Sequence, residues 1–380
     1  MTGSRAWLAL PAIILALTVA LLVWWRPLDQ LASGSPPVEE AAIEAVRLTP
    51  GLISLDVRSD GSEPVVIAQV QVDGAYRVFM ATPARPSAWL GKTRIDIPYP
   101  WIGGEAHHLA LVTATGAVFD HSIEVAQATP VVSGKSLALL LAVGLLLGAV
   151  PVATGLLVWP AMRAMPPAAV SFLLALTVGL LGFLLVDTSL EGLEAAHETI
   201  GRLRGPVLFW VVAALTVLLL LRLGRRGGQA PQGLRLAFFI ALGIGLHNLG
   251  EGLAVGAALA AGSAALASYL VIGFTIHNVT EGIGIAAPVA NERPRLMHFM
   301  GLVALAGFPA VIGTIAGTQA VSPLWITVCF AVAAGAILQV IIEVMALLLR
   351  RGGVARLFEG PVAGGLASGL AVMYATALLT

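Results

Sequence analysis

The chain has 380 residues, of which 58% are hydrophobic and only 11% are charged, and its formal net charge is zero. A soluble domain has roughly 25% charged residues, so this chain has too little charge to coat a soluble globule. The composition therefore excludes a single soluble domain and a disordered chain. Without net positive charge, we expect no nucleic-acid partner. The single cysteine, Cys329, excludes an internal disulfide and a cysteine metal cluster.

The amino-terminal region begins with an apolar run over residues 7–25, flanked by Arg5 and Arg26. This run is longer than the apolar core of a signal peptide, which has about 7–15 residues, and no clear cleavage site follows it. We therefore interpret residues 1–30 as an uncleaved membrane anchor, with a cleaved signal as the alternative. Residues 31–50, which contain a Ser/Pro/Glu stretch, are interpreted as a linker.

Residues 51–130 have a different pattern, in which short alternating runs are bounded by turn signals. Asp73-Gly74 lies between two such runs, and an Asp-Gly pair in that setting is the strongest short-range signal for a β-hairpin. Thr115-Gly116 has the same position later in the segment. Strands at this spacing, without a helical period, predict a small all-β sandwich. The expected strands are Leu52–Val57, Val65–Val72, Ala75–Ala81, His108–Thr113 and Ala117–Val125.

Residues 135–380 consist mainly of apolar runs that are long enough to cross a bilayer, which takes about 20 predominantly apolar residues for each helix. We therefore expect an α-helical polytopic membrane protein with an eight-helix bundle, which makes nine spans with the anchor. The eight spans are expected near residues 137–158, 169–188, 206–222, 236–258, 264–288, 297–316, 324–348 and 361–379.

The arginines in the short connections between the spans predict their orientation. If the chain enters the cytoplasm after the first span of the bundle, the outer connections contain only Arg202 and Arg204. Because basic residues accumulate in cytoplasmic loops, this bias predicts that the β-sandwich is extracytoplasmic. The ten arginines of the inner connections are Arg163, Arg222, Arg225, Arg226, Arg235, Arg293, Arg295, Arg350, Arg351 and Arg356.

Two neighbouring spans contain nearly the same set of polar residues, although charged groups inside apolar spans are costly. The pattern Gly-x-x-x-His-Asn-x-x-Glu-Gly occurs twice, 30 residues apart. In each copy His and Glu are four residues apart, so they lie on one face of a helix. The short connection makes the two helices antiparallel neighbours. We therefore expect a two-His, two-Glu cluster near mid-membrane, with His247 beside Glu281 and Glu251 beside His277.

Imidazole and carboxylate groups together suit Zn²⁺, Fe²⁺, Mn²⁺ or Co²⁺, and the set contains too much nitrogen for Ca²⁺ or Mg²⁺. Asn248 and Asn278, one step round each helix, can add carbonyl oxygens. No organic cofactor is indicated. One alternative is that the polar side chains only hold the helices together by hydrogen bonds. A catalytic zinc site is a further alternative, but the chain has no His-Glu-x-x-His and the motif has no Ser or Cys, so we do not expect an enzyme.

A His-Asn-x-x-Glu-Gly sequence in each of two adjacent central helices resembles the ZIP (Zrt/Irt-like) family of divalent metal transporters. The resemblance covers about residues 137–380 and does not include the sandwich. It implies uptake of Zn²⁺ or a related ion toward the cytoplasm, alternating access by movement of one helix bundle against another, and a homodimer. It also implies that the metal ligands are His247, Asn248, Glu251, His277, Asn278 and Glu281.

The chain departs from the ZIP pattern in both motif helices and in the next span. The family usually has proline directly before each motif glutamate, where this chain has Gly250 and Thr280, which permit only a softer bend. In the next span the family often has Glu-Pro, which supplies a ligand to a second metal, where this chain has Phe308-Pro309. We therefore expect a weak or absent second site and one metal, bound by His247, Glu251, His277 and Glu281.

Other polar side chains are candidates for the path to and from this site. Glu343, inside the seventh span, is predicted to be a ligand on the release path or, alternatively, a buried side chain bonded to Gln339. Asp187 and Glu191 are predicted to form an acidic outer mouth or, alternatively, a solvated helix end. Candidates for metal capture in the sandwich are Glu105, His107, His108, Asp120 and His121.

The sequence thus predicts transport of a divalent transition-metal cation, with Zn²⁺ the favoured ion, toward the cytoplasm. The abundance of Ala, Gly, Leu and Arg is typical of a bacterial protein, so the expected location is the cytoplasmic (inner) membrane. Expected partners are the metal ion, membrane lipid and a second copy of the chain. The alternative is a membrane metal sensor that binds the ion without conducting it, since the motif prolines and the usual glutamate at Phe308 are missing.

Overall fold

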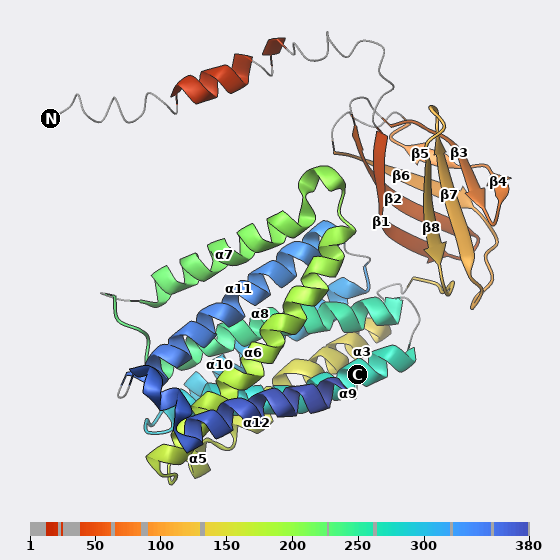
Figure 1. Ribbon diagram of the computed structural model, residues 1–380. Coiled ribbons are helices and arrows are strands. Elements are labelled where there is room, and N and C mark those ends of the chain that lie inside the picture. Colours follow the sequence, from red (N-terminus) through yellow and green to blue (C-terminus); the bar gives the residue numbers. More distant parts are fainter. Residues whose placement is uncertain are drawn as a thin grey trace.

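A computed structural model describes residues 13–21, 24–25, 39–61, 65–84, 90–129, 134–225, 228–260, 264–319, 322–350 and 353–378. It contains an antiparallel β-sandwich and a bundle of long helices (Figure 1). Within the predicted anchor, residues 13–21 and 24–25 are helical and exposed. The rest of the predicted anchor lies outside the described residues, so the anchor stays a prediction.

In the part of the β-sandwich that the structure describes, there are two four-stranded antiparallel sheets, with strand orders β1-β2-β6-β5 and β4-β3-β7-β8. Alternate apolar side chains from both sheets, among them Ile53, Ile95 and Leu109, are fully buried and form its core. Burial alternates with exposure along the strands, as expected for two sheets packed face to face. The strands are β1 (Glu39–Thr49), β2 (Leu52–Gly61), β3 (Ile67–Val72), β4 (Ala75–Arg77), β5 (Met80–Thr82), β6 (Gly91–Pro98), β7 (His107–Thr113) and β8 (Val118–Ile123).

Both predicted hairpins are confirmed. Asp73 and Gly74, with φ of 54° and 74°, connect β3 to β4, and Gly116, with φ of 93°, lies between β7 and β8. These positive φ values are what the short turns require of an Asp-Gly or Gly position. The predicted strand Ala75–Ala81 is divided, because β4 pairs with β3 while β5 pairs with β6 in the other sheet.

The linker prediction for residues 31–50 is wrong from Glu39 onward, where β1 begins. The charged residues that indicated a linker lie on an edge strand, where they remain near water or find partners. Glu44, a further charged residue of this strand, has a carboxylate that forms ion pairs with both Arg58 and Lys92. Strand β6 is not among the predicted strands, although its buried and exposed residues alternate regularly.

Among the described residues, the helical part contains seven segments that are long and apolar enough to cross a membrane, so the chain is a multi-pass helical membrane protein with a β domain. The eighth predicted span, near 361–379, forms helix α12 (Gly360–Ala377), which is shorter and is not one of these seven segments. The other helices are α3 (Gly134–Gly144), the π-helical turn η1 (Leu145–Ala149), α4 (Val150–Leu156), α5 (Trp159–Met162), α6 (Pro167–His197), α7 (Gly205–Gly224), α8 (Gly233–Ala260), α9 (Ala264–Ala286), α10 (Leu296–Gly317) and α11 (Pro323–Leu349).

The described helices form one continuous bundle, in which two groups can be distinguished. In the motif group, α8, α9 and α10 pack with α3, η1 and α4; in the support group, α6, α7, α11 and α12 pack with one another. Close contact within the motif group depends on glycine: a Cβ on Gly282 of α9 would collide with the carbonyl of Val152 on α4. The two groups meet where α8 lies against α11 and where α9 approaches α6.

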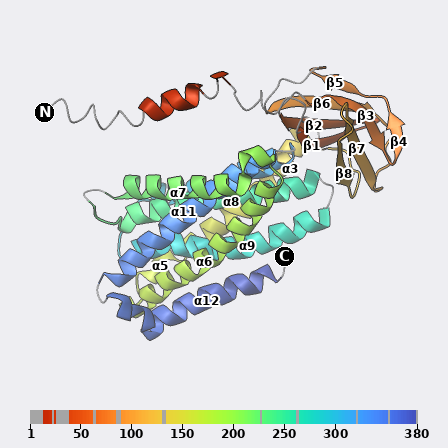
Figure 2. The same ribbon diagram turned by 45° about the horizontal axis from the view of Figure 1, so that its top comes forward.

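The sandwich lies at the end of the bundle where α6 ends (Figure 2). Gly201, in the short 3₁₀ helix η2 (Gly201–Leu203), donates its backbone N–H to Glu40 Oε1 of β1 at 2.5 Å. Between the sandwich and the bundle is a cavity of about 760 Å³, with walls from β8 and from helices α6, α8 and α11. The β domain therefore covers part of the helix ends.

Candidate metal centre

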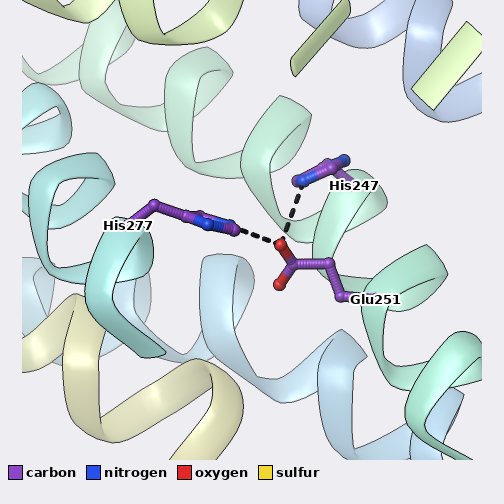
Figure 3. A group of neighbouring side chains, drawn as sticks. All are labelled: His247, Glu251 and His277. Atoms are coloured by element: carbon purple, nitrogen blue, oxygen red, sulfur yellow. Dashed lines mark hydrogen bonds and ion pairs between the residues drawn. The ribbon is translucent and has the colours of Figure 1, made fainter. Parts of the chain in front are cut away.

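Three buried side chains from the two motif helices converge in the bundle interior. His277 Nε2 of α9 lies 2.5 Å from Oε1 of Glu251, and His247 Nε2 lies 3.2 Å from the same oxygen (Figure 3). Each of the three residues is at most 5% exposed. Their three ligand atoms lie within 4.8 Å of one another, so this group can hold a metal ion. The expected contact between Glu251 and His277 is thereby confirmed.

The spacing of the three atoms is close to that of a transition-metal site. Zinc–nitrogen and zinc–oxygen bonds are about 2.0–2.2 Å, so two ligand atoms on a tetrahedral ion lie roughly 3.3 Å apart. The 3.2 Å between His247 Nε2 and Glu251 Oε1 matches this separation. The 2.5 Å between His277 and Glu251 is instead a hydrogen bond, which an ion would replace after the ring moved outward by about 1 Å.

Glu281 lies near this group without joining it. It is 2% exposed, and neither of its carboxylate oxygens has a hydrogen-bond partner among the described residues. It is close enough to interact electrostatically with His277, His247 and Glu251. The expected pairing of Glu281 with His247 is not formed as a direct contact. A buried carboxylate without a partner requires a cation or a proton, so Glu281 remains a predicted ligand.

The two motif asparagines are fixed by contacts to neighbouring helices. Asn248 Nδ2 donates to the carbonyl of Ala306 on α10 at 3.0 Å, and Asn278 Nδ2 donates to the carbonyl of Leu147 in η1 at 2.9 Å. Asn278 Nδ2 also donates to Glu251 Oε2 at 3.0 Å. In both asparagines Oδ1 is buried and has no hydrogen-bond partner among the described residues. These orientations leave both carbonyl oxygens available, as the ligand prediction requires.

One further residue at this site, Thr188 on α6, is not among the predicted site residues. Its Oγ1 lies 2.9 Å from His247 Nδ1, and the residue is 0% exposed. The available signal was a hydroxyl residue within an apolar span, directly after Asp187. That signal is weak, because threonine hydroxyls inside helices usually bond to a carbonyl of their own helix, as Thr177 does.

The predicted outer mouth is a half-buried acidic region rather than a freely solvated helix end. Asp187 is half-buried and near enough to interact electrostatically with His247 and Glu251. Glu191, one turn further along α6, lines the cavity under the sandwich together with Glu194 and Glu198. Partial burial, and then the neighbouring charge of Glu194, raise the pKa of Glu198 above its ordinary value.

Four of the five capture candidates lie on the paired strands β7 and β8, but among the described residues they do not bring three ligand atoms together. Only His121 lines the cavity, and burial lowers its pKa, which favours the neutral imidazole that can bind a cation. His107 is part of the sandwich interior, where its Nδ1 lies 2.8 Å from Asp73 Oδ2. His108 lies 3.8 Å from Asp120 on the neighbouring strand. Glu105 is exposed in the loop before β7.

Glu343 has a partner that neither interpretation of the sequence included. It is 0% exposed, and its Oε1 accepts a hydrogen bond of 2.8 Å from Nε of Arg225, the residue directly after α7. Gln339, the expected alternative partner, has no hydrogen-bond partner for either side-chain polar atom among the described residues. The buried charge is therefore balanced by an arginine near the end of the helix, and the release-path role stays a prediction.

The positions that depart from the ZIP pattern have clear local structures. Helices α8 and α9 continue through Gly250 and Thr280, and Thr280 Oγ1 donates to the carbonyl of His277 at 2.5 Å. Phe308 on α10 is 51% exposed, so its side chain points away from the buried cluster. These observations agree with motif helices that are not broken and, among the described residues, with a single cluster of metal ligands.

The chain matches no protein-family model, and no curated protein is significantly similar to it. The resemblance to ZIP transporters therefore depends on the paired motif. The structure independently defines a multi-pass membrane protein with a buried His-Glu-His group that fits a membrane metal-binding site.

Proposed function

We propose that the protein transports a divalent transition-metal cation toward the cytoplasm and is a ZIP-type transporter. The observation on which this proposal depends is the buried convergence of His247, Glu251 and His277 from two adjacent membrane helices. The unpaired Glu281 carboxylate nearby adds negative charge that a cation would balance. Imidazole with carboxylate favours Zn²⁺, with Fe²⁺, Mn²⁺ and Co²⁺ as the other candidates.

A path for the ion is supported on both sides of the site. Glu191, Glu194 and Glu198 surround the cavity under the sandwich and would concentrate cations at the outer mouth. Asp187, one turn before Glu191 on α6, is near enough to interact electrostatically with His247 and Glu251 of the buried cluster. On the inner side, Glu343 would receive the ion after displacement of Arg225. The proposal includes an eight-helix transport bundle, a homodimer, a bacterial inner-membrane location and an extracytoplasmic sandwich.

The division of the bundle into two groups supports a mechanism. His247, Glu251 and His277 all belong to the motif group, which contacts α6 and α11 of the support group. Movement of one group along the other would expose the site alternately to the two sides of the membrane. Each exposure would let the ion exchange with one aqueous phase, because a charged site cannot release an ion into lipid.

A membrane metal sensor is the second candidate, and one observation favours it. Helices α8 and α9 are not broken at the motif, so fewer backbone carbonyls are free to guide an ion than in a helix interrupted by proline. A sensor would bind the ion at the same cluster and would not release it on the other side.

Zinc uptake into proteoliposomes that contain a trapped zinc dye separates these candidates. We expect time-dependent uptake by the unchanged protein and its loss in His277→Ala and Glu281→Ala. His298→Ala is the matched control, because His298 is exposed on α10, outside the cluster. Zinc binding without uptake, with Fe²⁺ and Mn²⁺ also tested, would contradict transport and favour the sensor. Absence of any metal binding would mean that the motif only holds helices together.

A further inference from the structure

Thr188 belongs to the support group of helices, yet its side chain reaches the metal cluster in the motif group. Its Oγ1 lies 2.9 Å from Nδ1 of His247, and both residues are buried. Because Thr188 lies on α6 and His247 on α8, this hydrogen bond crosses the boundary between the two groups. The contact thus connects the geometry of a candidate ligand to the relative position of the groups.

The hydrogen bond determines which nitrogen of His247 can bind an ion. Nε2 faces Glu251 at 3.2 Å and has no hydrogen-bond partner among the described residues. A neutral histidine that binds metal through one ring nitrogen has its hydrogen on the other and donates it to a nearby acceptor. With an ion on Nε2, the Nδ1–H group of His247 would donate to the hydroxyl oxygen of Thr188. That bond would hold the ring in its binding orientation.

The other anchoring contacts of the site stay within the motif group. Asn248 is bonded to α10, and Asn278 is bonded to η1 and to Glu251. If the two groups moved relative to each other, these contacts would stay intact, whereas the hydrogen bond between Thr188 and His247 would break. A displacement of about 2 Å along the interface would lengthen a 2.9 Å contact beyond the range of a hydrogen bond.

We propose that Thr188 is a positioning residue that strengthens His247 as a metal ligand in this arrangement of the two groups and weakens it when the groups separate. The inference rests on the proposed metal transport. Loss of an outer-shell partner of a metal-bound histidine typically lowers metal affinity by about 10- to 100-fold. One hydrogen bond can therefore make the site bind tightly in one position of the groups and release its ion in the other.

The test uses Co²⁺ as the probe, because its visible spectrum reports the ligands and geometry of the bound ion. Thr188→Val keeps the shape of the side chain and removes the hydroxyl, while Thr188→Ser keeps the hydroxyl. Thr177→Val is the matched control, because Thr177 is also buried on α6 and bonds to the carbonyl of Leu173 in its own helix. Each full-length variant is purified and its folded fraction isolated by size-exclusion chromatography before titration.

In Thr188→Val we expect the Kd for Co²⁺ to rise by about 10- to 100-fold and the spectrum to change. We expect Thr188→Ser and Thr177→Val to keep the Kd and spectrum of the unchanged protein. In zinc uptake, Thr188→Val should raise KM and leave the maximal rate intact, because the contact is already broken when the ion is released.

Two results would overturn the inference, and they are distinguishable. If folded Thr188→Val has the Kd and spectrum of the unchanged protein, Thr188 only fills space, and the proposed transport still stands. If the unchanged protein binds no Co²⁺, or if His277→Ala keeps the Kd and spectrum of the unchanged protein, the metal site itself is contradicted.

Discussion

The described part of the chain contains a histidine–carboxylate cluster in the sandwich, where Asp73 is exposed, and another that is buried in the bundle, and they differ in how completely their polar atoms are paired. In the sandwich, Asp73 accepts hydrogen bonds from the Tyr99 hydroxyl and the His108 backbone N–H, and its Oδ2 also contacts His107. Among the polar atoms of this cluster that the structure describes, only His107 Nε2 is buried without a hydrogen-bond partner. This cluster stabilises a turn.

The cluster in the bundle contains the same chemical groups but leaves many of their atoms unpaired. Both oxygens of Glu281, Nε2 of His247 and Oδ1 of both motif asparagines are buried without hydrogen-bond partners among the described residues. Unpaired buried polar atoms are costly, so a folded protein that contains several together has a reason for them. Residue type alone therefore does not identify a binding site; the number of unpaired atoms that converge at one point is more informative.

The largest expected effect comes from removing the shared carboxylate of the bundle cluster. Glu251→Gln eliminates the charge that both histidines contact, and we expect Zn²⁺ affinity to fall by at least 100-fold, because the loss of about 3 kcal/mol from a charged buried contact corresponds to that factor. Isothermal titration calorimetry of the purified protein measures this. Asp73→Asn in the sandwich is the matched change and should leave Zn²⁺ affinity unaltered; a similar loss in both variants would contradict the distinction between the clusters.

The second effect concerns the buried ion pair at the inner side of the bundle. Arg225→Ala leaves Glu343 fully buried without a cation. We expect the free energy of unfolding to fall by about 1–3 kcal/mol. This value is reduced because the Arg225 side chain is 37% exposed, so that solvent screens the ion pair. Adding Glu343→Gln should restore most of this loss, since the uncharged amide no longer needs a cation. Thermal unfolding in detergent measures both variants. If the double variant were no more stable than Arg225→Ala, the ion pair would not be the cause.

A third effect tests whether close helix packing supports the cluster. In Gly282→Ala the added Cβ would collide with the Val152 carbonyl, so α9 must shift. We expect the free energy of unfolding to fall by about 1–3 kcal/mol and Zn²⁺ binding to become weaker. Gly301→Ala, on α10, is the control, because nothing lies within 4 Å of its added Cβ. Equal thermal stability of the two variants would exclude a special role for the contact between α4 and α9.

The smallest effect is on the pH dependence of the sandwich. Burial raises the pKa of Asp73, but the hydrogen bonds from His108, His107 and Tyr99 outweigh it and hold the pKa below its ordinary value of 3.8. A lowered pKa contributes stability above the unfolded value, and this contribution disappears as the pH falls through the folded value. Hydrogen exchange in β3 and β7 should therefore quicken below about pH 4.

Asp73→Asn is the control for this pH dependence. At neutral pH the amides of β3 and β7 should exchange faster in this variant than in the unchanged protein, which corresponds to a free energy of opening that is lower by no more than about 1 kcal/mol. The acceleration of exchange at acid pH should be absent. If exchange in Asp73→Asn still became faster at acid pH, as in the unchanged protein, the pH dependence would arise from another carboxyl group.

The sequence was informative where the pattern is local. The Asp73-Gly74 turn, the seven long apolar helices and the proximity of Glu251 to His277 all follow from short spacings along one or two elements. It was misleading where tertiary contacts override composition. Strand β1 looked like a linker because the partners of its charged residues, such as Arg58, lie on other strands.

The missed site residues share a single physical reason. Thr188 approaches His247 from α6, and Arg225 approaches Glu343 from the end of α7, so each contact joins residues far apart in the chain. A hydroxyl in an apolar span and an arginine after a helix are both common, and neither indicates a partner by itself. Only the packing of the helices brings these pairs together.

X-ray absorption spectroscopy of the zinc-loaded protein tests most directly whether the unpaired cluster is the metal site. We expect two imidazole nitrogens at about 2.0–2.1 Å, with oxygen atoms completing the shell. His277→Ala should remove one imidazole from this spectrum, and His107→Ala in the sandwich should leave the spectrum unchanged. A spectrum without imidazole ligands, or one that changes in His107→Ala and not in His277→Ala, would contradict the assignment of the metal site to α8 and α9.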